Sequence, residues 1–140
     1  MRIGVILDSR ASATELAELA ALAERSGLSA VWSSSLLDSR DPFVNWMPAA
    51  AATRAIGIGP IAVNPYDTHP VRICSSLLTF NEAANGRAHI VIGGGGEALE
   101  ALGIEPTKRV RAVRDAIEIL TRAGPDAPLT YEGGLFSVKN

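Results

Sequence analysis

Short apolar runs alternate along the chain with stretches in which apolar residues recur every three or four positions. The apolar runs are typical of strands, and they cover residues 2–7, 28–33, 56–63 and 88–92. The second pattern is typical of helices that pack one face on a core, and it covers residues 12–26, 41–53, 70–84 and 107–123. Because strands and helices alternate, the chain is predicted to form a parallel sheet with crossover helices.

Some of these elements allow a prediction about which side faces the core. The first strand, residues 2–7, is largely apolar, which is typical of a strand buried on both faces. The first helix has a capping-box pattern at Ser12 and Glu15, and its expected inward residues are Leu16, Leu19, Ala20 and Ala23. The last long helix is expected to begin with Thr107 as its cap, and its expected inward residues are Val110, Val113, Ile117 and Leu120.

Four strand–helix repeats fit two architectures. One is a doubly wound open sheet, and the other is half of a (β/α)8 TIM barrel, whose full length is typically about 250 residues. After the fourth repeat, residues 129–138 are predicted to form a small hairpin around Gly133 and Gly134. With 140 residues, the chain is expected to form a single domain over residues 1–140.

Both architectures place a ligand at the carboxyl ends of the strands. The residues expected there are Asp8 and residues 33–35, 62–64 and 93–97. The third strand ends abruptly, because Pro65 has no amide to donate to a neighbouring strand. Pro70 is suited to start the next helix, with His69 or Thr68 as its cap. These features predict a small-molecule site at that edge of the sheet.

Four glycines, residues 93–96, follow the fourth strand and allow a backbone to approach a ligand closely. Gly93, Gly95 and Ala98 match a G-x-G-x-x-A dinucleotide fingerprint, although that fingerprint normally follows the first strand. A Rossmann-type nicotinamide protein is therefore a third interpretation. Glu97 comes directly after the glycines, where its carboxylate either favours the helix dipole or acts as an acid or base in a pocket.

The composition argues against several classes of function. Hydrophobic residues make up 47% and charged residues 20% of the chain, as in a globular protein. The net charge of -2, without a basic cluster, argues against nucleic acid as a partner. Cys74 is the single cysteine, and His69 and His89 lie at opposite ends of their elements, so no shared metal site is expected. No apolar run reaches the roughly 20 residues that span a bilayer, so a cytoplasmic protein without a membrane partner is expected.

Several motifs occur in an order that resembles the luciferase-like monooxygenase superfamily. They are Val31-Trp32, Asp41-Pro42, Ala51-Ala52-Thr53, residues 59–70, Asn85-Gly86-Arg87 and Thr130-Tyr131-Glu132-Gly133. Residues 94–99, followed by Leu102-Gly103-Ile104, resemble the branch that uses coenzyme F420, which includes methylenetetrahydromethanopterin reductase. The resemblance covers essentially all 140 residues but only the N-terminal half of the family's (β/α)8 barrel. It therefore implies a half barrel of four βα units followed by the hairpin.

The resemblance also implies a cofactor site. In this family a bulge at the end of the third strand backs the central deazaflavin ring, and the matching residues are Ile61, Ala62 and Val63, with a cis peptide bond between Ile61 and Ala62. The other implied cofactor-binding residues are Ser35, Asn64, Gly95, Gly96 and Glu97. Glu97 also matches a carboxylate proposed as a catalytic acid in some F420-dependent dehydrogenases. Ser35 stands where the family usually has Asp or Glu, and Leu36 where it often has His, which disfavours a sugar-phosphate dehydrogenase.

The implied function is that of an oxidoreductase that transfers a hydride between a small organic substrate and coenzyme F420. There are two alternatives: an FMN-dependent luciferase-like monooxygenase, and a non-catalytic half barrel that serves as an assembly module. Because a half barrel exposes two strand edges, we expect a homo-oligomer or pairing with a C-terminal half. The residues do not identify the substrate.

Overall fold

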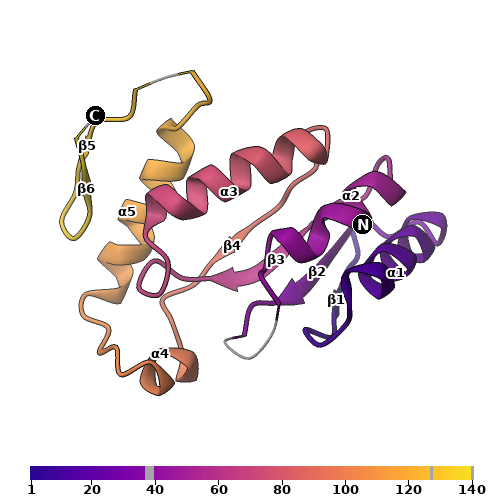
Figure 1. Ribbon diagram of the computed structural model, residues 1–140, viewed down its shortest axis with the longest axis horizontal. Coiled ribbons are helices and arrows are strands. Elements are labelled where there is room, and N and C mark those ends of the chain that lie inside the picture. Colours follow the sequence, from indigo (N-terminus) through magenta and orange to yellow (C-terminus); the bar gives the residue numbers. More distant parts are fainter. Residues whose placement is uncertain (37–39, 127, 140) are drawn as a thin grey trace. The chain divides into compact units, whose positions relative to one another are not determined.

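Strands and helices alternate along the chain, as Figure 1 shows. The computed structural model describes residues 1–36, 40–126 and 128–139. Its elements are β1 (Gly4–Leu7), α1 (Ala13–Arg25), β2 (Ala30–Ser34), the 3-10 helix η1 (Val44–Trp46), α2 (Met47–Ala52), β3 (Gly57–Val63), α3 (Pro70–Ala83), β4 (Val91–Ile92), α4 (Glu97–Ala101), α5 (Arg109–Arg122), β5 (Tyr131–Glu132) and β6 (Ser137–Val138). The predicted βα repeats and the C-terminal hairpin are confirmed.

The four main strands form one sheet in the order β1-β2-β3-β4. β1 pairs in parallel with β2, with Gly4 opposite Ala30, and β2 pairs in parallel with β3, with Ala30 opposite Gly57. An additional parallel bridge joins Ile58 to Ala88. A doubly wound sheet would reverse its strand order at a switch point. The sequential order therefore contradicts the Rossmann-type interpretation and agrees with half of a (β/α)8 barrel.

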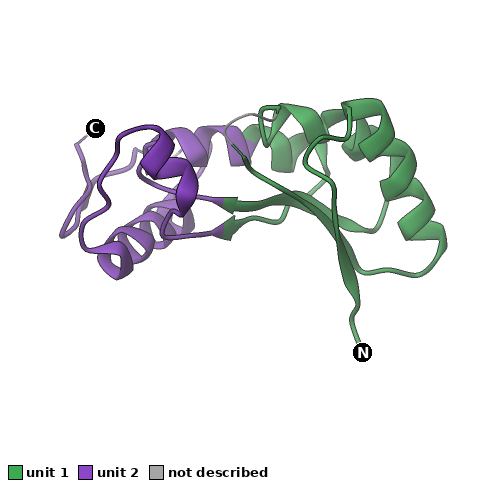
Figure 2. Ribbon diagram, turned by 90° about the horizontal axis from the view of Figure 1, so that it is seen from below, with its two compact units in different colours: residues 1–62, 79–91 green, residues 63–78, 92–140 purple. Residues whose placement is uncertain are grey.

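The chain divides into two compact units, which Figure 2 distinguishes by colour. The first unit comprises residues 1–62 and 79–91, and the second comprises residues 63–78 and 92–140. Each unit is described by itself below. The expectation of a single domain over residues 1–140 stays a prediction.

In the first unit, α1 packs against α2 through its inward face. The predicted capping box is present, because the Ser12 hydroxyl accepts from the Glu15 amide and the Glu15 carboxylate accepts from the Ser12 amide. The inward residues Leu16, Ala20 and Ala23 are buried as predicted. Leu19 is 40% exposed, so the prediction that it faces inward is wrong.

Two charged side chains hold the connection between α2 and β3. The Glu24 carboxylate accepts hydrogen bonds of 2.9, 2.6 and 2.9 Å from three successive amides, those of residues 54–56. Burial alone would raise the pKa of Glu24, but these amides outweigh burial and lower it. The Arg87 guanidinium donates to the carbonyls of Ala50, Thr53 and Ile56 at the end of α2. Arg87, one of the motif residues, therefore has a structural role in the first unit.

The prediction that residues 2–7 are buried on both faces is wrong. Ile3 is 52% exposed, Val5 is 37% exposed and Ile6 is 56% exposed. The physical reason is that β1 pairs with β2 alone, so one edge of this strand and much of its apolar surface have no neighbour among the described residues.

The inward face of α5 also differs from the prediction. The buried residues are Ala112, Asp115, Ala116 and Ile119, whereas Val110 is 81% exposed and Ile117 is 47% exposed. The expected cap, Thr107, is also wrong, because the residue before the helix is Lys108 and no side chain caps it. The pattern of apolar residues predicted the wrong inward face, because the face that is buried contains a carboxylate, Asp115.

Asp115 anchors the β5–β6 hairpin to α5 within the second unit. The residue is 1% exposed and accepts hydrogen bonds from the Tyr131 hydroxyl (3.0 Å) and from the amides of Leu135 (2.7 Å) and Phe136 (3.1 Å). Burial alone would raise the pKa of Asp115, but these donors outweigh it and hold the pKa below its usual value. Asp115 thus holds the hairpin on α5 through three hydrogen bonds.

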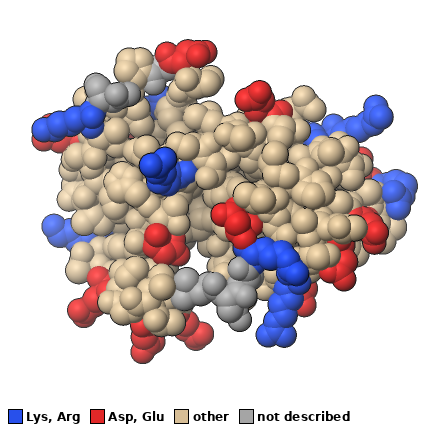
Figure 3. Space-filling view, viewed as in Figure 1, with Lys and Arg blue, Asp and Glu red and all other residues tan. Residues whose placement is uncertain are grey.

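The charged side chains are distributed without a continuous basic surface on the face that Figure 3 shows, where acidic and basic residues are interspersed. Of the helices in the described part of the chain, none combines the length and the apolar character that crossing a membrane requires.

Replacing Asp115 with alanine is expected to lower the free energy of unfolding by about 3 kcal/mol, because the buried Tyr131 hydroxyl and two part-buried amides lose a charged acceptor. The matched control is Glu132→Ala, which removes an exposed carboxylate from the same hairpin and should cost less than about 0.5 kcal/mol. Urea unfolding followed by circular dichroism measures both variants. If both variants have the same free energy of unfolding, Asp115 does not have the anchoring role.

The Tyr131 hydroxyl is expected to ionise only at high pH. Burial, together with its hydrogen bond to the Asp115 carboxylate, raises the pKa of Tyr131 to about 12. Because the folded-state pKa is raised, the stabilisation is complete below about pH 10, the usual tyrosine pKa, and is lost as the pH rises towards 12. A Tyr66→Phe variant leaves Tyr131 as the single tyrosine, so its absorbance titration reports this group directly. A midpoint near 10 in the folded variant would refute the assignment, and adding Asp115→Asn should lower the midpoint.

Candidate functional site

The carboxyl end of β3 contains the cis peptide bond that was predicted between Ile61 and Ala62. Residues 57–60 of the strand are buried, whereas Ile61 and Ala62 are partly exposed. The Ser35 amide donates a hydrogen bond of 3.1 Å to the Ile61 carbonyl, so the chain that leaves β2 lies beside this end of β3. Within the first unit, the structure thus brings together Ser35, Ile61 and Ala62 at one strand end.

Asn64 begins the loop between β3 and α3 and folds that loop through its own side chain. Its Oδ1 accepts from the amides of Tyr66 (3.0 Å) and Asp67 (3.2 Å), and its Nδ2 donates to the Asp67 carboxylate (2.6 Å). The Tyr66 hydroxyl donates to the Thr107 carbonyl, which ties the loop to the segment before α5. Asn64 therefore shapes this loop in the second unit, and its place beside a cofactor ring stays a prediction.

The glycine segment after β4 starts beside the end of β3, because the Gly93 amide donates a hydrogen bond of 2.8 Å to the Val63 carbonyl. Gly95 has a φ of 79°, and a Cβ on it would lie 2.1 Å from Leu99 Cδ1, so a side chain is not tolerated there. Gly96 precedes α4, and a Cβ on it would have no atom within 4 Å. The segment thus leaves the backbone of Gly96 open to a bound group.

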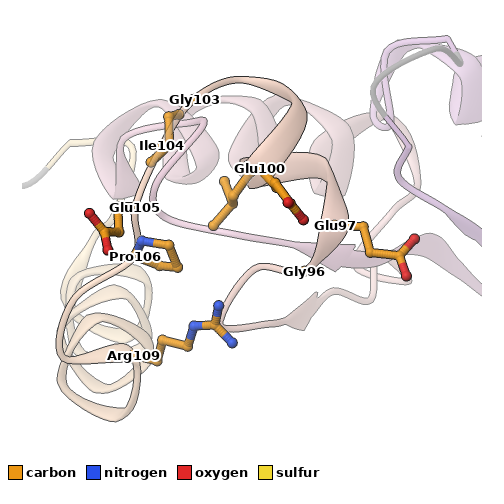
Figure 4. A pocket seen from close by; sticks show the side chains of 9 residues that line it. Gly96, Glu97, Glu100, Gly103, Ile104, Glu105, Pro106 and Arg109 are labelled. Atoms are coloured by element: carbon orange, nitrogen blue, oxygen red, sulfur yellow. The ribbon is translucent and has the colours of Figure 1, made fainter.

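Glu97 is the first residue of α4 and lies at the rim of a pocket in the second unit, with a volume of about 520 Å³. The pocket is lined by Gly96, Glu97, Leu99, Glu100, Gly103, Ile104, Glu105, Pro106 and Arg109. Figure 4 shows the Glu97 carboxylate pointing away from Arg109. Among the described residues, no hydrogen bond or ion pair holds this carboxylate. The Glu97 carboxylate is therefore open to solvent.

The sequence-based prediction did not include Glu100, Glu105 and Arg109, which also line this pocket. Glu100 follows Glu97 by three positions, so helical spacing could have placed it on the same side of α4. Arg109 opens α5 and meets Gly94 by tertiary packing, with a distance of 3.4 Å between its Cβ and the Cβ position of Gly94. No local signal in the sequence indicates that approach.

The two histidines have structural surroundings, as predicted. In the first unit, the His89 ring lies against Gly57 and its centroid is 6.5 Å from the Trp32 ring. In the second unit, His69 caps α3, because its carbonyl accepts from the Ile73 amide and its Nδ1 accepts from the Val71 amide (3.3 Å). Within residues 1–36, 40–126 and 128–139, no cluster of three or more His, Cys, Asp or Glu residues is arranged to hold a metal ion.

Two local features test whether these residues suit the flat ring of a deazaflavin or flavin. Ile61 and Ala62 offer partly exposed apolar surface where β3 leaves the core, and burying such surface against a ring is favourable. Gly96 offers a backbone position with no neighbouring atom where a side chain would stand. The apolar surface of Ile61 and Ala62 in the first unit and the open backbone of Gly96 in the second unit are each suited to contact a flat ring.

Comparison with known proteins identifies the family. Residues 1–140 match the sequence profile of the luciferase-like monooxygenase family. A 5,10-methylenetetrahydromethanopterin reductase of Archaeoglobus fulgidus is 32% identical over 123 residues, which cover 87% of this chain and 37% of that protein. An F420-dependent glucose-6-phosphate dehydrogenase of Kineococcus radiotolerans is 30% identical over 138 residues, which cover 89% of this chain and 41% of that protein.

The fold has a close counterpart among solved structures. The coenzyme F420-dependent tetrahydromethanopterin reductase of Methanopyrus kandleri superposes with a TM-score of 0.91 at 24% identity, over 99% of this chain and 44% of that one. The chain thus spans about two fifths of the length of the relatives that it matches. With a family match over its whole length, the chain belongs to the luciferase-like monooxygenase family, and its fold is half of a TIM barrel.

Proposed function

We propose that this chain takes part in hydride transfer between a small organic substrate and coenzyme F420. The observation that carries the proposal is the identity of 32% and 30% to a methylenetetrahydromethanopterin reductase and to an F420-dependent dehydrogenase over nearly nine tenths of this chain. The cis peptide position, the open backbone at Gly96 and the position of Glu97 agree with the residues that the family resemblance implies.

The residues of the chain have separate tasks in this proposal. Ile61, Ala62 and Val63 supply the backing surface for the central ring, and Ser35 and Asn64 hold the neighbouring loops through their backbone and side-chain hydrogen bonds. Gly95 and Gly96 let the backbone approach closely. Bound F420 would supply the carbon that accepts or donates the hydride. The protein contributes position and exclusion of water.

Glu97 is the residue we propose as the proton donor or acceptor. Its carboxylate is exposed at the first position of α4 and has no partner among the described residues that would hold the side chain in one place. A group with this freedom can turn towards a substrate. Its carboxylate also stabilises the start of α4 through the helix dipole, so the two interpretations of Glu97 are compatible.

The substrate that we favour is a reduced pterin rather than a sugar phosphate. Ser35 and Leu36 replace the acidic residue and the histidine that the resemblance places at these positions, and Leu36 is 50% exposed. Neither of these two side chains is the carboxylate or imidazole base that the oxidation of a sugar hydroxyl would use. Methylenetetrahydromethanopterin, named by the reductase relative, is the first substrate to test.

Gly96→Val is expected to weaken the binding of F420 at least tenfold, because its side chain would occupy the open position above the backbone. Ala101→Val places the same side chain on an exposed residue of α4 outside the pocket and should leave the affinity unchanged. The intrinsic fluorescence of F420 gives the dissociation constant in a titration of the 140-residue chain. Equal affinities for the two variants would place the cofactor elsewhere.

The same titration with FMN discriminates between the alternatives. The family name includes monooxygenases, so FMN is the rival cofactor. Tight FMN binding without F420 binding would replace our proposal with an FMN-dependent monooxygenase. If neither cofactor binds, the assembly-module interpretation becomes the better one.

Glu97→Gln is expected to lower the turnover number by a factor of about 100 or more while the affinity for F420 stays the same, because the amide neither donates nor accepts the proton as a carboxyl group does. The matched control is Glu100→Gln, which lines the same pocket one turn further along α4. The reaction is followed by the absorbance of F420 with methylenetetrahydromethanopterin. A loss of the same size in both variants would contradict a specific role of Glu97.

A further inference from the structure

The first half of α5 gathers positive charge around one cavity of the second unit. The cavity has a volume of about 440 Å³. It is lined by Lys108, Arg109, Val110, Arg111 and Arg114, all of which are exposed. Four of these five side chains are cationic, and among the described residues no acidic side chain lines the cavity. Its walls therefore present positive charge to whatever enters it.

The carboxylates that helical spacing brings nearest to these arginines are already engaged. Asp115 follows Arg111 by four positions, but its oxygens accept hydrogen bonds from the β5–β6 hairpin. Glu118 follows Arg114 by four positions, but it forms an ion pair of 3.3 Å with Arg122. In the part of the chain that the structure describes, none of the four cationic side chains at the cavity donates a hydrogen bond or forms an ion pair. The cluster therefore has no counter-charge from these residues.

The position of the cluster makes these charges unfavourable for α5 itself. They lie at the start of the helix, where the helix dipole favours anions and disfavours cations. The structure describes all of α5, and its first turn contains no acidic residue and no side-chain cap. Arg111 and Arg114 are three positions apart, so their like charges are neighbours on the helix surface. An anion bound in the cavity would offset both effects.

Two glycines make room for arginines of the cluster. A Cβ on Gly134 would lie 2.8 Å from both Cδ and Nη1 of Arg111, so this side chain lies against the turn of the β5–β6 hairpin. A Cβ on Gly94 would lie 3.4 Å from Cβ of Arg109. Figure 4 shows the Arg109 guanidinium and the Glu105 carboxylate pointing in different directions. Packing thus holds both arginines at the cavity, while their charges stay unpaired among the described residues.

We propose that this cavity binds a small compound that carries a phosphate or diphosphate group. A phosphate concentrates more than one negative charge on one compact group, and a guanidinium group can donate to two of its oxygens at once. The cavity shares only Arg109 with the pocket at Glu97, so we assign it to a compound other than the proposed cofactor. The inference does not rest on the proposed function, because its test uses an inorganic probe without F420.

Isothermal titration calorimetry of the 140-residue chain with inorganic diphosphate, at constant ionic strength, tests the proposal. One diphosphate per chain is expected to bind, with a dissociation constant of about 1 mM or below. Arg114→Gln should raise this constant about tenfold, because it removes a charge-assisted contact.

The matched control is Arg122→Gln, which removes the same charge from the same helix but outside the cavity and should change the affinity less than about twofold. Circular dichroism verifies that both variants are folded. A wild-type chain that does not bind diphosphate, or equal affinities of the two variants, would overturn the proposal.

Two further titrations test the chemical class of the compound and its separation from the cofactor. Citrate carries its negative charges on separate carboxylates rather than on one compact group, so it should bind severalfold more weakly than diphosphate. Equal affinities for the two anions would contradict the assignment to phosphate. F420 also contains a phosphate group, and its addition should leave the affinity for diphosphate unchanged. Competition between F420 and diphosphate would assign the cavity to the cofactor and overturn the proposal of a second compound.

Discussion

The close approach of residues 88 and 89 to β3 is the constraint on which the first unit depends. A Cβ on Gly59 would lie 1.8 Å from the carbonyl oxygen of His89, so only glycine allows this approach. Beside it, the Ile58 amide donates to the Arg87 carbonyl, and the His89 amide donates to the Ile58 carbonyl. This pairing brings Arg87 to the end of α2, where its guanidinium holds three carbonyls. Gly59 thus allows residues 87–89 to pair with β3, and this pairing positions Arg87 at the connection between α2 and β3.

Much of this fold could be predicted from the sequence because it depends on local patterns. Alternating apolar runs and helical repeats predicted the βα order, and the capping box at Ser12 followed from residue types at a fixed spacing. The end of β3 could be placed because Pro65 has no amide. The cis bond between Ile61 and Ala62 is different, since nothing in the residue types indicates it, and it was predicted only through the family resemblance.

The predictions that failed involve partners distant in the sequence. Periodicity assigned Val110 and Ile117 to the core, but the opposite face of α5 is buried because Asp115 on that face receives the hairpin amides from residues 135 and 136. Similarly, the apolar run at residues 2–7 was expected to be buried, although burial needs neighbours on both sides of β1. Arg109 belongs to the pocket through tertiary packing against Gly94, which no spacing rule describes.

The candidate site is built from strand ends and the loops that follow them. In barrels of this type the strand ends carry function and the outer helix surfaces carry packing. The residues that we assign to the cofactor follow this division, because Ile61 and Ala62 lie at the carboxyl end of β3 and Gly96 lies in the loop after β4.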